Sequence, residues 1–261
     1  DSFAIDRELF YELDSDVHLI DPQWLLNNGY FKLDQSDLDT VTEDVGPFIG
    51  NTIFRRTDPW HEYRYYSLYG AFEKVAQVFD RVDRYEAVKA VHDETVAQVG
   101  ANLPSADARP NALLCFGASD EPEQFYPYVI GEGTGFKHLT DLGVRDALAS
   151  TDIKDFHGSR AAIDLETLLD VDPPVMMLRG YENMTADEFQ DTVVDFLRND
   201  DTASGLTAVQ NGRVFRGGPT YQGPIYNLFL VERGAKDLYP NRFSGELFDR
   251  SRVADIVAGE V

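Results

Sequence analysis

Residues 163–178 read IDLETLLDVDPPVMML, and this stretch combines the two kinds of element from which α/β proteins are built. Glu166 stands at the start of a short apolar helix, where the positive end of the helix dipole favours a carboxylate. Pro173 and Pro174 then stop that helix, because proline cannot continue one. The apolar run VMML is typical of a buried strand. The stretch therefore predicts a helix, a turn and a strand in close succession.

The same order of residues occurs near the start of the chain, in residues 7–17 (RELFYELDSDV). Glu8 corresponds to Glu166, an apolar residue follows each glutamate five positions later, and a turn leads into an apolar strand. The helix dipole explains one such glutamate, but it does not explain why two distant segments share the arrangement. The echo predicts two lobes of related construction.

Short apolar segments alternate with helical patterns around both of these stretches. Such alternation is typical of mainly parallel sheets with helices on both faces. We therefore expect an α/β protein of two lobes, with a partial N-terminal lobe in residues 1–67 and a C-terminal lobe in residues 104–261. Within the second lobe, residues 206–209 and 213–215 flank Asn-Gly, which predicts a β-hairpin.

A long apolar stripe at helical spacing runs through residues 68–99. The segment contains no proline, and its Gly70 lies near the start. Gly100 and Pro104 end the pattern. At 1.5 Å per residue, one helix over this segment would reach about 45 Å. We expect residues 68–103 to form a single long helix that joins the two lobes as a rigid spine.

The chain is strongly acidic, with 46 acidic and 23 basic residues and a net charge of −23. Such a surface repels nucleic acid, which argues against a DNA or RNA partner. The acid is spread along the chain, with 30 Asp and 16 Glu, and Lys is scarce. This coat resembles those of salt-loving archaea, whose self-repulsion is screened at high salt. An ordinary acidic protein is the alternative.

Signatures of catalysis and of metal binding are missing from the sequence. The five histidines are scattered without an HExxH pattern, and no GxSxG elbow occurs. Cys115 is the only cysteine, so neither an internal disulfide nor a site of several cysteines can form within the chain. We expect no catalytic residue, no metal-ligating residue and no cofactor.

In their order and spacing, these motifs resemble the substrate-binding proteins of ABC importers for ferric siderophores, haem and cobalamin, which form class III of the periplasmic binding proteins. The resemblance rests on the two glutamate-led units and on GTGFKHLTDLGVRDALA at residues 133–149, which is similar to a family helix. It also rests on GLTAVQNGRVFRGG at residues 205–218, which resembles the late hairpin of the family. The opening strands of the family and its signal region would precede Glu8, so the N-terminal lobe looks truncated.

The resemblance implies an extracytoplasmic protein that binds a solute and is not an enzyme. It implies that a ferric-siderophore-type chelate lies in a cleft between the lobes and is delivered to an ABC permease. Glu8 and Glu166 would each dock on arginines of that permease. A lipid or peptide anchor outside the visible sequence would hold the protein at the outer side of the cell membrane. Cobalamin or haem binding within the same family is an alternative, as is a chelatase-like tetrapyrrole enzyme on a similar fold.

Aromatic and basic residues follow the predicted strands, and ligands of open α/β sheets bind at the carboxyl ends of strands. Aromatic rings offer apolar contact, and arginine pairs with carboxylate or catecholate oxygens. We expect six such residues to face one basic and aromatic cleft that holds an anionic iron chelate. They are Trp60, Tyr66, Tyr128, Arg179, Tyr181 and Tyr221. Each tyrosine or tryptophan taken singly fits a core position equally well.

Overall fold

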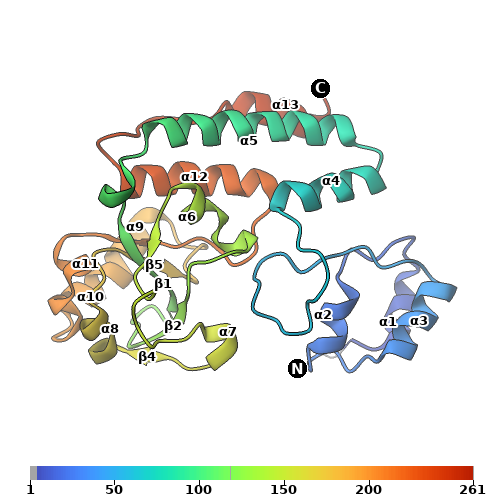
Figure 1. The fold of residues 1–261 in the computed structure, drawn as a ribbon, viewed down its shortest axis with the longest axis horizontal. Coiled ribbons are helices and arrows are strands. Elements are labelled where there is room, and N and C mark those ends of the chain that lie inside the picture. The colour runs from blue at the N-terminus through green and yellow to red at the C-terminus, as the bar shows by residue number, and fades with distance from the viewer. Residues whose placement is uncertain (1–4, 118, 261) are drawn as a thin grey trace.

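The computed structural model describes residues 5–117 and 119–260 and shows two lobes beside a layer of long helices (Figure 1). The N-terminal lobe is formed by α1 (Arg7–Leu13), α2 (Pro22–Asn27) and α3 (Gln35–Asp44). The helical layer contains α4 (Leu68–Val78), α5 (Val82–Asn102), α12 (Pro224–Leu238) and α13 (Arg250–Ala258). No helix of the described residues has the length and apolar character needed to cross a membrane.

The C-terminal lobe is built on one mixed sheet of six strands. Their order is β4-β2-β1-β5-β6, and β3 pairs with β1. The pairings β1–β5, β5–β6 and β1–β3 are parallel, whereas β1–β2 and β2–β4 are antiparallel. The strands are β1 (Asn111–Gly117), β2 (Gln124–Tyr128), β3 (Arg145–Asp146), β4 (Ile163–Asp164), β5 (Met176–Arg179) and β6 (Val214–Arg216).

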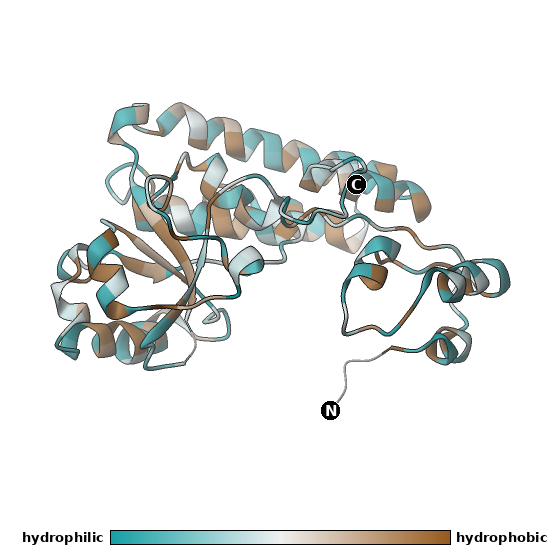
Figure 2. Ribbon diagram, turned by 60° about the horizontal axis from the view of Figure 1, so that its bottom comes forward, coloured by the Kyte–Doolittle hydropathy of each residue, from teal (hydrophilic) through white to brown (hydrophobic). Residues whose placement is uncertain are grey.

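Shorter helices flank this sheet. They are α6 (Lys137–Asp141), α7 (Phe156–Ser159), α8 (Leu165–Val171), α9 (Ala186–Phe189), α10 (Asp195–Asn199) and α11 (Thr207–Gln210), and a π-helical segment at Gln190–Val194 joins α9 to α10. Figure 2 shows hydrophobic residues concentrated on the strands of this lobe. Leu113 and Cys115 pack into a cluster on one face of the sheet, and Ala112 and Leu114 pack into a second cluster on the other. Because β1 is covered on both faces, its sequence is a continuous apolar run.

The echo between the two lobes is present in the structure. α1 and α8 each span seven residues, and each begins after an aspartate, Asp6 or Asp164, whose side chain accepts a backbone N–H of the first turn. Each helix ends at an aspartate in the left-handed conformation, Asp14 with φ 42° and Asp172 with φ 40°. Asp is one of the few residues other than glycine that tolerates this conformation. The two-lobed α/β architecture expected from the sequence is confirmed.

The N-terminal lobe contains much less sheet than expected. Two of its short apolar segments, residues 17–20 and 47–50, meet in one parallel bridge, in which His18 donates its backbone N–H to the Pro47 carbonyl and Ile49 donates to the His18 carbonyl. Phe10, Leu25 and Val41 form a small core under this bridge. Among the described residues, the expected parallel sheet of the N-terminal lobe is therefore represented by this single bridge.

The prediction of one helix over residues 68–103 is wrong, because α4 and α5 are separate helices that pack against each other (Figure 1). The break lies at Asp80, which has φ 51°. Arg81 donates its N–H to the Ala76 carbonyl at 2.8 Å, and Asp80 donates to the Gln77 carbonyl at 3.3 Å. This pair of bonds is the Schellman motif that ends helices, usually with glycine at the left-handed position.

The apolar stripe continues across the break because both helices bury it in the same core. Tyr69 and Ala76 of α4 cluster with Val88 and Val91 of α5 and with Leu228 of α12. Periodicity therefore reports the buried face of the hairpin and does not show the turn within it. The two lobes are joined by a helical hairpin that is packed on α12 and α13.

The predicted β-hairpin around Asn211-Gly212 is also wrong. Thr207–Gln210 forms α11, and Arg213 donates its N–H to the Ala208 carbonyl at 2.7 Å while Gly212 has φ 61°. Asn-Gly thus caps a helix here, again in a Schellman motif, and β6 follows in parallel with β5.

Candidate functional site

The loop of residues 51–66 leaves the N-terminal lobe and makes backbone contacts with the C-terminal lobe. Thr134 donates its N–H to the Ile53 carbonyl at 2.8 Å, and Gly135 donates to the Phe54 carbonyl at 3.1 Å. A Cβ atom on Gly133 or Gly135 would lie 2.5 Å or 2.9 Å from that Phe54 oxygen. Gly133 also has φ 132°, so glycine is required for this close approach.

Asp21 fixes the other side of the same loop. Its carboxylate accepts the Gln23 N–H at the start of α2, the Thr52 N–H at 2.7 Å and the Tyr63 hydroxyl at 2.5 Å. Burial, together with this carboxylate, raises the pKa of Tyr63 far above its usual value, so Tyr63 remains a hydrogen-bond donor. The loop is therefore bound to the N-terminal lobe through Asp21 and to the C-terminal lobe through Thr134 and Gly135.

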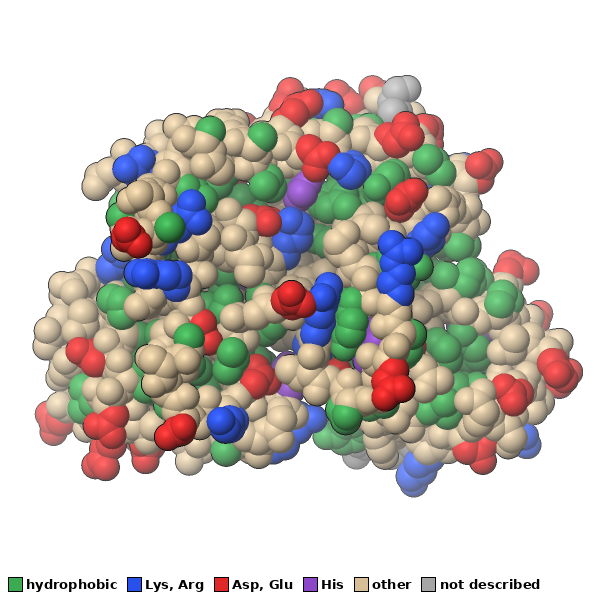
Figure 3. All heavy atoms as spheres, viewed as in Figure 1, with side chains coloured by type: hydrophobic (Ala, Val, Ile, Leu, Met, Phe, Trp, Pro, Cys, Tyr) green, Lys and Arg blue, Asp and Glu red, His purple; other side chains and the backbone are tan. Residues whose placement is uncertain are grey.

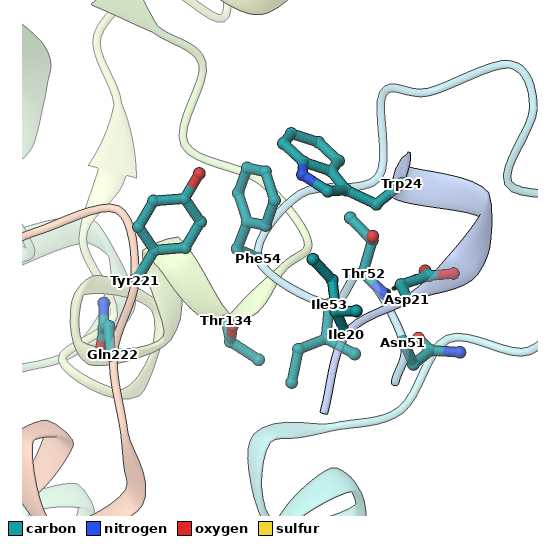
Figure 4. A pocket seen from close by; sticks show the side chains of 10 residues that line it. All are labelled: Ile20, Asp21, Trp24, Asn51, Thr52, Ile53, Phe54, Thr134, Tyr221 and Gln222. Carbon is teal, nitrogen blue, oxygen red and sulfur yellow. Dashed lines mark hydrogen bonds between the residues drawn. The ribbon is translucent and has the colours of Figure 1, made fainter. Parts of the chain in front are cut away.

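A hollow of about 320 Å³ lies where this loop meets the C-terminal lobe, and Figure 4 shows its lining. Phe54 stands between Trp24 of α2 and Tyr221 of the C-terminal lobe (Figure 4). Its ring centroid is 5.5 Å from that of Trp24 and 4.9 Å from that of Tyr221. These edge-to-face contacts make an aromatic cluster that spans the lobes.

A larger hollow of about 630 Å³ adjoins the first and shares Trp24 and Tyr221 with it. Trp60, His157 and Arg160 are among its other lining residues. We call the two hollows together the junction cleft. Both tryptophans of the chain border it, and so does Tyr221, whose exposed fraction is 66%.

Arg55 lines the larger hollow of the junction cleft, and three of its five N–H donors are already engaged. Its Nε and Nη2 donate to the two carboxylate oxygens of Asp58 at 2.7 Å and 2.6 Å, and its Nη1 lies 2.7 Å from His157 Nδ1. The guanidinium also lies over the rings of Trp24 at 5.3 Å and Phe54 at 5.0 Å. Arg55 is only 8% exposed, so this arrangement forms a buried ion pair.

His157 is neutral in this environment. Burial, followed by the charge of Arg55, lowers its pKa to about 4. Because the Arg55 N–H must be the donor in their hydrogen bond, Nδ1 of His157 acts as the acceptor and the proton resides on Nε2. His157 therefore adds no charge to the cleft at neutral pH.

Arg179 lies below the junction cleft and is 2% exposed. Its Nη2 donates to the Gly135 carbonyl at 2.5 Å, its Nη1 lies 3.4 Å from the Thr220 hydroxyl, and its guanidinium lies 4.9 Å from the ring of Tyr128. Burial lowers the pKa of Arg179 to about 10, so it remains charged at neutral pH. Arg179 and Tyr128 form the floor that supports Gly135.

The six residues selected from the sequence are thus divided by the structure. Trp60 and Tyr221 border the junction cleft, and Tyr128 and Arg179 lie beneath it. Tyr66 borders a separate hollow beside α4.

Tyr181 is 3% exposed, and its hydroxyl donates to the Ser119 carbonyl at 2.6 Å. It packs in the cluster on the far face of the sheet, so a core position accounts for it. The structure therefore does not bring Tyr66 and Tyr181 to the cleft.

The expectation of a basic cleft needs correction. Arg55 is paired with Asp58, and the neighbouring Arg56 is paired with Glu132 across the lobes at 2.5 Å. Sequence reasoning did not select Asp58 or His157. The turn signal Asp58-Pro59 was visible, but His157 is 102 positions from Arg55, and no local pattern joins them. Within the described residues, no group of three or more His, Cys, Asp or Glu side chains could hold a metal ion.

Glu8 and Glu166 are both exposed and occupy the same position in their helices, one residue after the first. Figure 1 shows α1 and α8 on the side of the molecule away from α5 and α13. Acidic side chains are frequent along that lower edge of both lobes, and basic ones reach into the middle of the same face (Figure 3).

Comparisons with known proteins agree with this architecture. The sequence profile of the family described as periplasmic binding protein matches residues 5–221. No match was found among curated protein sequences.

Three solved structures illustrate the likeness in fold. The triscatecholate siderophore binding protein FeuA of Bacillus subtilis, complexed with ferri-bacillibactin, is 15% identical over 90% of this chain and 75% of its own, with a TM-score of 0.58. An ABC-type Fe³⁺-hydroxamate transport protein of Saccharomonospora viridis is 18% identical over 90% and 72%, with a TM-score of 0.57. The TroA-like periplasmic binding protein FepB of Veillonella parvula is 16% identical over 97% and 71%, with a TM-score of 0.61.

The protonation of His157 predicts a pH dependence of stability. Folded His157 takes up its proton near pH 4, whereas histidine in an unfolded chain does so near pH 6.5. Between these values the unfolded chain binds more protons, so the free energy of unfolding should fall as the pH decreases from 6.5 towards 4. His157→Gln, which keeps an acceptor for Arg55, should lose this part of the dependence.

Urea unfolding of the two proteins at matched pH values measures the difference. All other titrating groups, the buried His138 included, are common to both proteins and cancel in the comparison. Parallel stability curves for the two proteins would contradict the assignment.

Proposed function

The chain belongs to the periplasmic binding protein family, and on this premise we propose that it binds a ferric-siderophore-type chelate in the junction cleft and delivers it to an ABC importer permease. Members of the family bind solutes on the extracytoplasmic side of the membrane and do not convert them. The alternative of a chelatase-like enzyme is therefore set aside.

One observation carries the proposal. Aromatic side chains of both lobes, Trp24 and Trp60 from the first and Tyr221 from the second, border one cleft at the lobe junction. A ligand that contacts all three would join the lobes, and aromatic walls suit a bulky chelate with an apolar exterior. FeuA and the Saccharomonospora protein, which share the fold, are described as siderophore and iron-hydroxamate proteins, and this supports the choice of ligand class.

Haem held through a histidine ligand is less well suited to this cleft. Haem iron needs an axial side-chain ligand such as histidine. His157 is the histidine that borders the cleft, and its Nδ1 already accepts a hydrogen bond from Arg55.

The ligand proposal predicts a fluorescence signal. Because both tryptophans border the cleft, an iron chelate bound there should quench the intrinsic fluorescence. Tyr221→Ala should weaken binding by about 1 kcal/mol, roughly five-fold, through the loss of one aromatic contact. Tyr11→Ala, an exposed tyrosine on α1, should leave the affinity unchanged. The ligand class would be rejected if a panel of ferric siderophores failed to quench the unmodified protein.

We further propose that Glu8 and Glu166 dock on the permease. Their matched places in α1 and α8, one in each lobe, would give a basic partner two fixed points. Changing both to Ala should abolish transport and leave chelate affinity intact, because neither residue borders the cleft.

The matched control changes Glu12 and Asp170 to Ala. These exposed carboxylates lie on the same two helices, so the control removes the same charge. Transport by reconstituted permease measures both variants. Equal losses in the two would show that net charge, and not these two glutamates, drives docking.

The net charge of −23 also leads us to propose adaptation to high salt, as in haloarchaeal proteins. Screening shortens the Debye length to about 3 Å at molar salt and relieves the repulsion among the surface carboxylates. The Tm should therefore be higher in molar KCl than in dilute buffer. Thermal unfolding monitored by tryptophan fluorescence measures the difference. Potassium chloride is preferable to sulfate, because sulfate strengthens apolar burial by itself. A Tm that is independent of KCl would argue for an ordinary acidic protein.

A further inference from the structure

The junction cleft has few positive charges that a ligand could use. Arg179 is buried in the floor of the cleft, where its Nη2 donates to the Gly135 carbonyl. Arg160 is exposed at the border of the larger hollow and, among the described residues, makes no ion pair. Arg55 is the remaining arginine of the lining, and its charge is opposed by Asp58 at 2.6 Å.

Arg55 and Asp58 form a mostly buried ion pair with two hydrogen bonds. Both side chains are 10% exposed, and the two bonds between them are parallel and bidentate. The third donor, Nη1, is directed at His157. A bidentate pair of this kind is strong and holds a fixed geometry, so the Nε–Nη2 fork of Arg55 is not open to an incoming anion.

The net charge of the ferric chelate decides whether such a cleft can bind it. Each hydroxamate group carries a single negative charge, so three of them neutralise Fe³⁺ and give an uncharged complex. Each catecholate carries two, so three of them leave the complex triply negative. A triply negative complex would lose hydration on entering this partly buried site, and the Arg55–Asp58 pair, which has no net charge, would not compensate for that loss.

We propose that Asp58 is a charge-selectivity residue: by neutralising Arg55, it sets the junction cleft to take an uncharged ferric chelate of the hydroxamate type in preference to a tris-catecholate. This inference rests on the proposed function. The remaining polar groups of the larger hollow fit an uncharged ligand, because Asn28 and Tyr221 offer neutral donors for hydroxamate carbonyl oxygens.

A purely structural role is the competing explanation for Asp58. Its backbone carbonyl accepts the His61 N–H at 3.1 Å in the turn that presents Trp60, so Asp58 also shapes the loop. Loss of that shape would weaken the binding of every chelate alike. Loss of charge selection would change only the ratio between neutral and anionic chelates.

The test titrates the full chain by tryptophan quenching with two probes at one ionic strength: ferrichrome, an uncharged ferric trihydroxamate, and ferric enterobactin, a triply negative tris-catecholate. The unmodified protein should bind ferrichrome more tightly. Asp58→Asn, which keeps the shape and one acceptor oxygen, should shift the affinity ratio towards ferric enterobactin by about ten-fold. Asp195→Asn, which removes the partner of Arg198 at the same spacing on α10, should leave the ratio unchanged.

A double variant keeps the test decisive if Asp58→Asn folds poorly. Arg55→Gln combined with Asp58→Asn removes both charges and should restore the ratio of the unmodified protein. A preference of the unmodified protein for ferric enterobactin, or an equal loss of both affinities in Asp58→Asn, would overturn the role of Asp58. Failure of the unmodified protein to bind either probe would instead overturn the proposed function itself.

Discussion

The peptide of Gly135 is the contact on which the arrangement of the two lobes depends. Its N–H donates to the Phe54 carbonyl of the other lobe, and its carbonyl accepts both Arg179 Nη2 at 2.5 Å and Gln222 Nε2 at 2.9 Å. One residue thus links the loop of the first lobe to the buried polar floor of the second. The absence of a side chain permits this, because a Cβ would lie 2.9 Å from the Phe54 oxygen. Burying Arg179 requires partners for its donors, and the Gly135 carbonyl is one of them.

The sequence predicted those elements whose cause is local. β5 lies in a continuous apolar run because it is covered on both faces, and the echoed helices begin and end at aspartates that cap them. The sequence analysis missed the helix break at Asp80, because glycine is the usual signal for a left-handed residue at the end of a helix and aspartate is not. At Gly212 the glycine was seen, but the same Schellman bonds ended a helix where a hairpin was expected. Apolar periodicity shows which face of a helix is buried. It does not reveal a turn between two helices that bury the same face.

For the site, the rule that ligands bind at strand ends had partial success. It led to Trp60 and Tyr221, which border the cleft, and to Arg179, which lies under it. It misplaced Tyr181, because Gly180, with φ 98°, turns the chain after β5 and the tyrosine packs on the far face of the sheet. The pairing of Arg55 with Asp58 and His157 could not be predicted, since it depends on how the loop of residues 51–66 meets α7 across the lobe junction.

Weak contacts between the lobes are consistent with a cleft that opens. The loop and the C-terminal lobe share two backbone bonds, each worth about 1 kcal/mol net, together with the Arg55–His157 hydrogen bond and the Arg56–Glu132 ion pair. Phe54 adds one edge-to-face contact to Tyr221 of the C-terminal lobe, worth roughly 0.5–1.5 kcal/mol. A chelate that touches Trp60 and Tyr221 could offset a few kcal/mol of such contacts by bridging the lobes itself. Since the buried pair of Arg55 and Asp58 lies within one loop, it would move with that loop, and the net charge of the pair would be the same before and after opening.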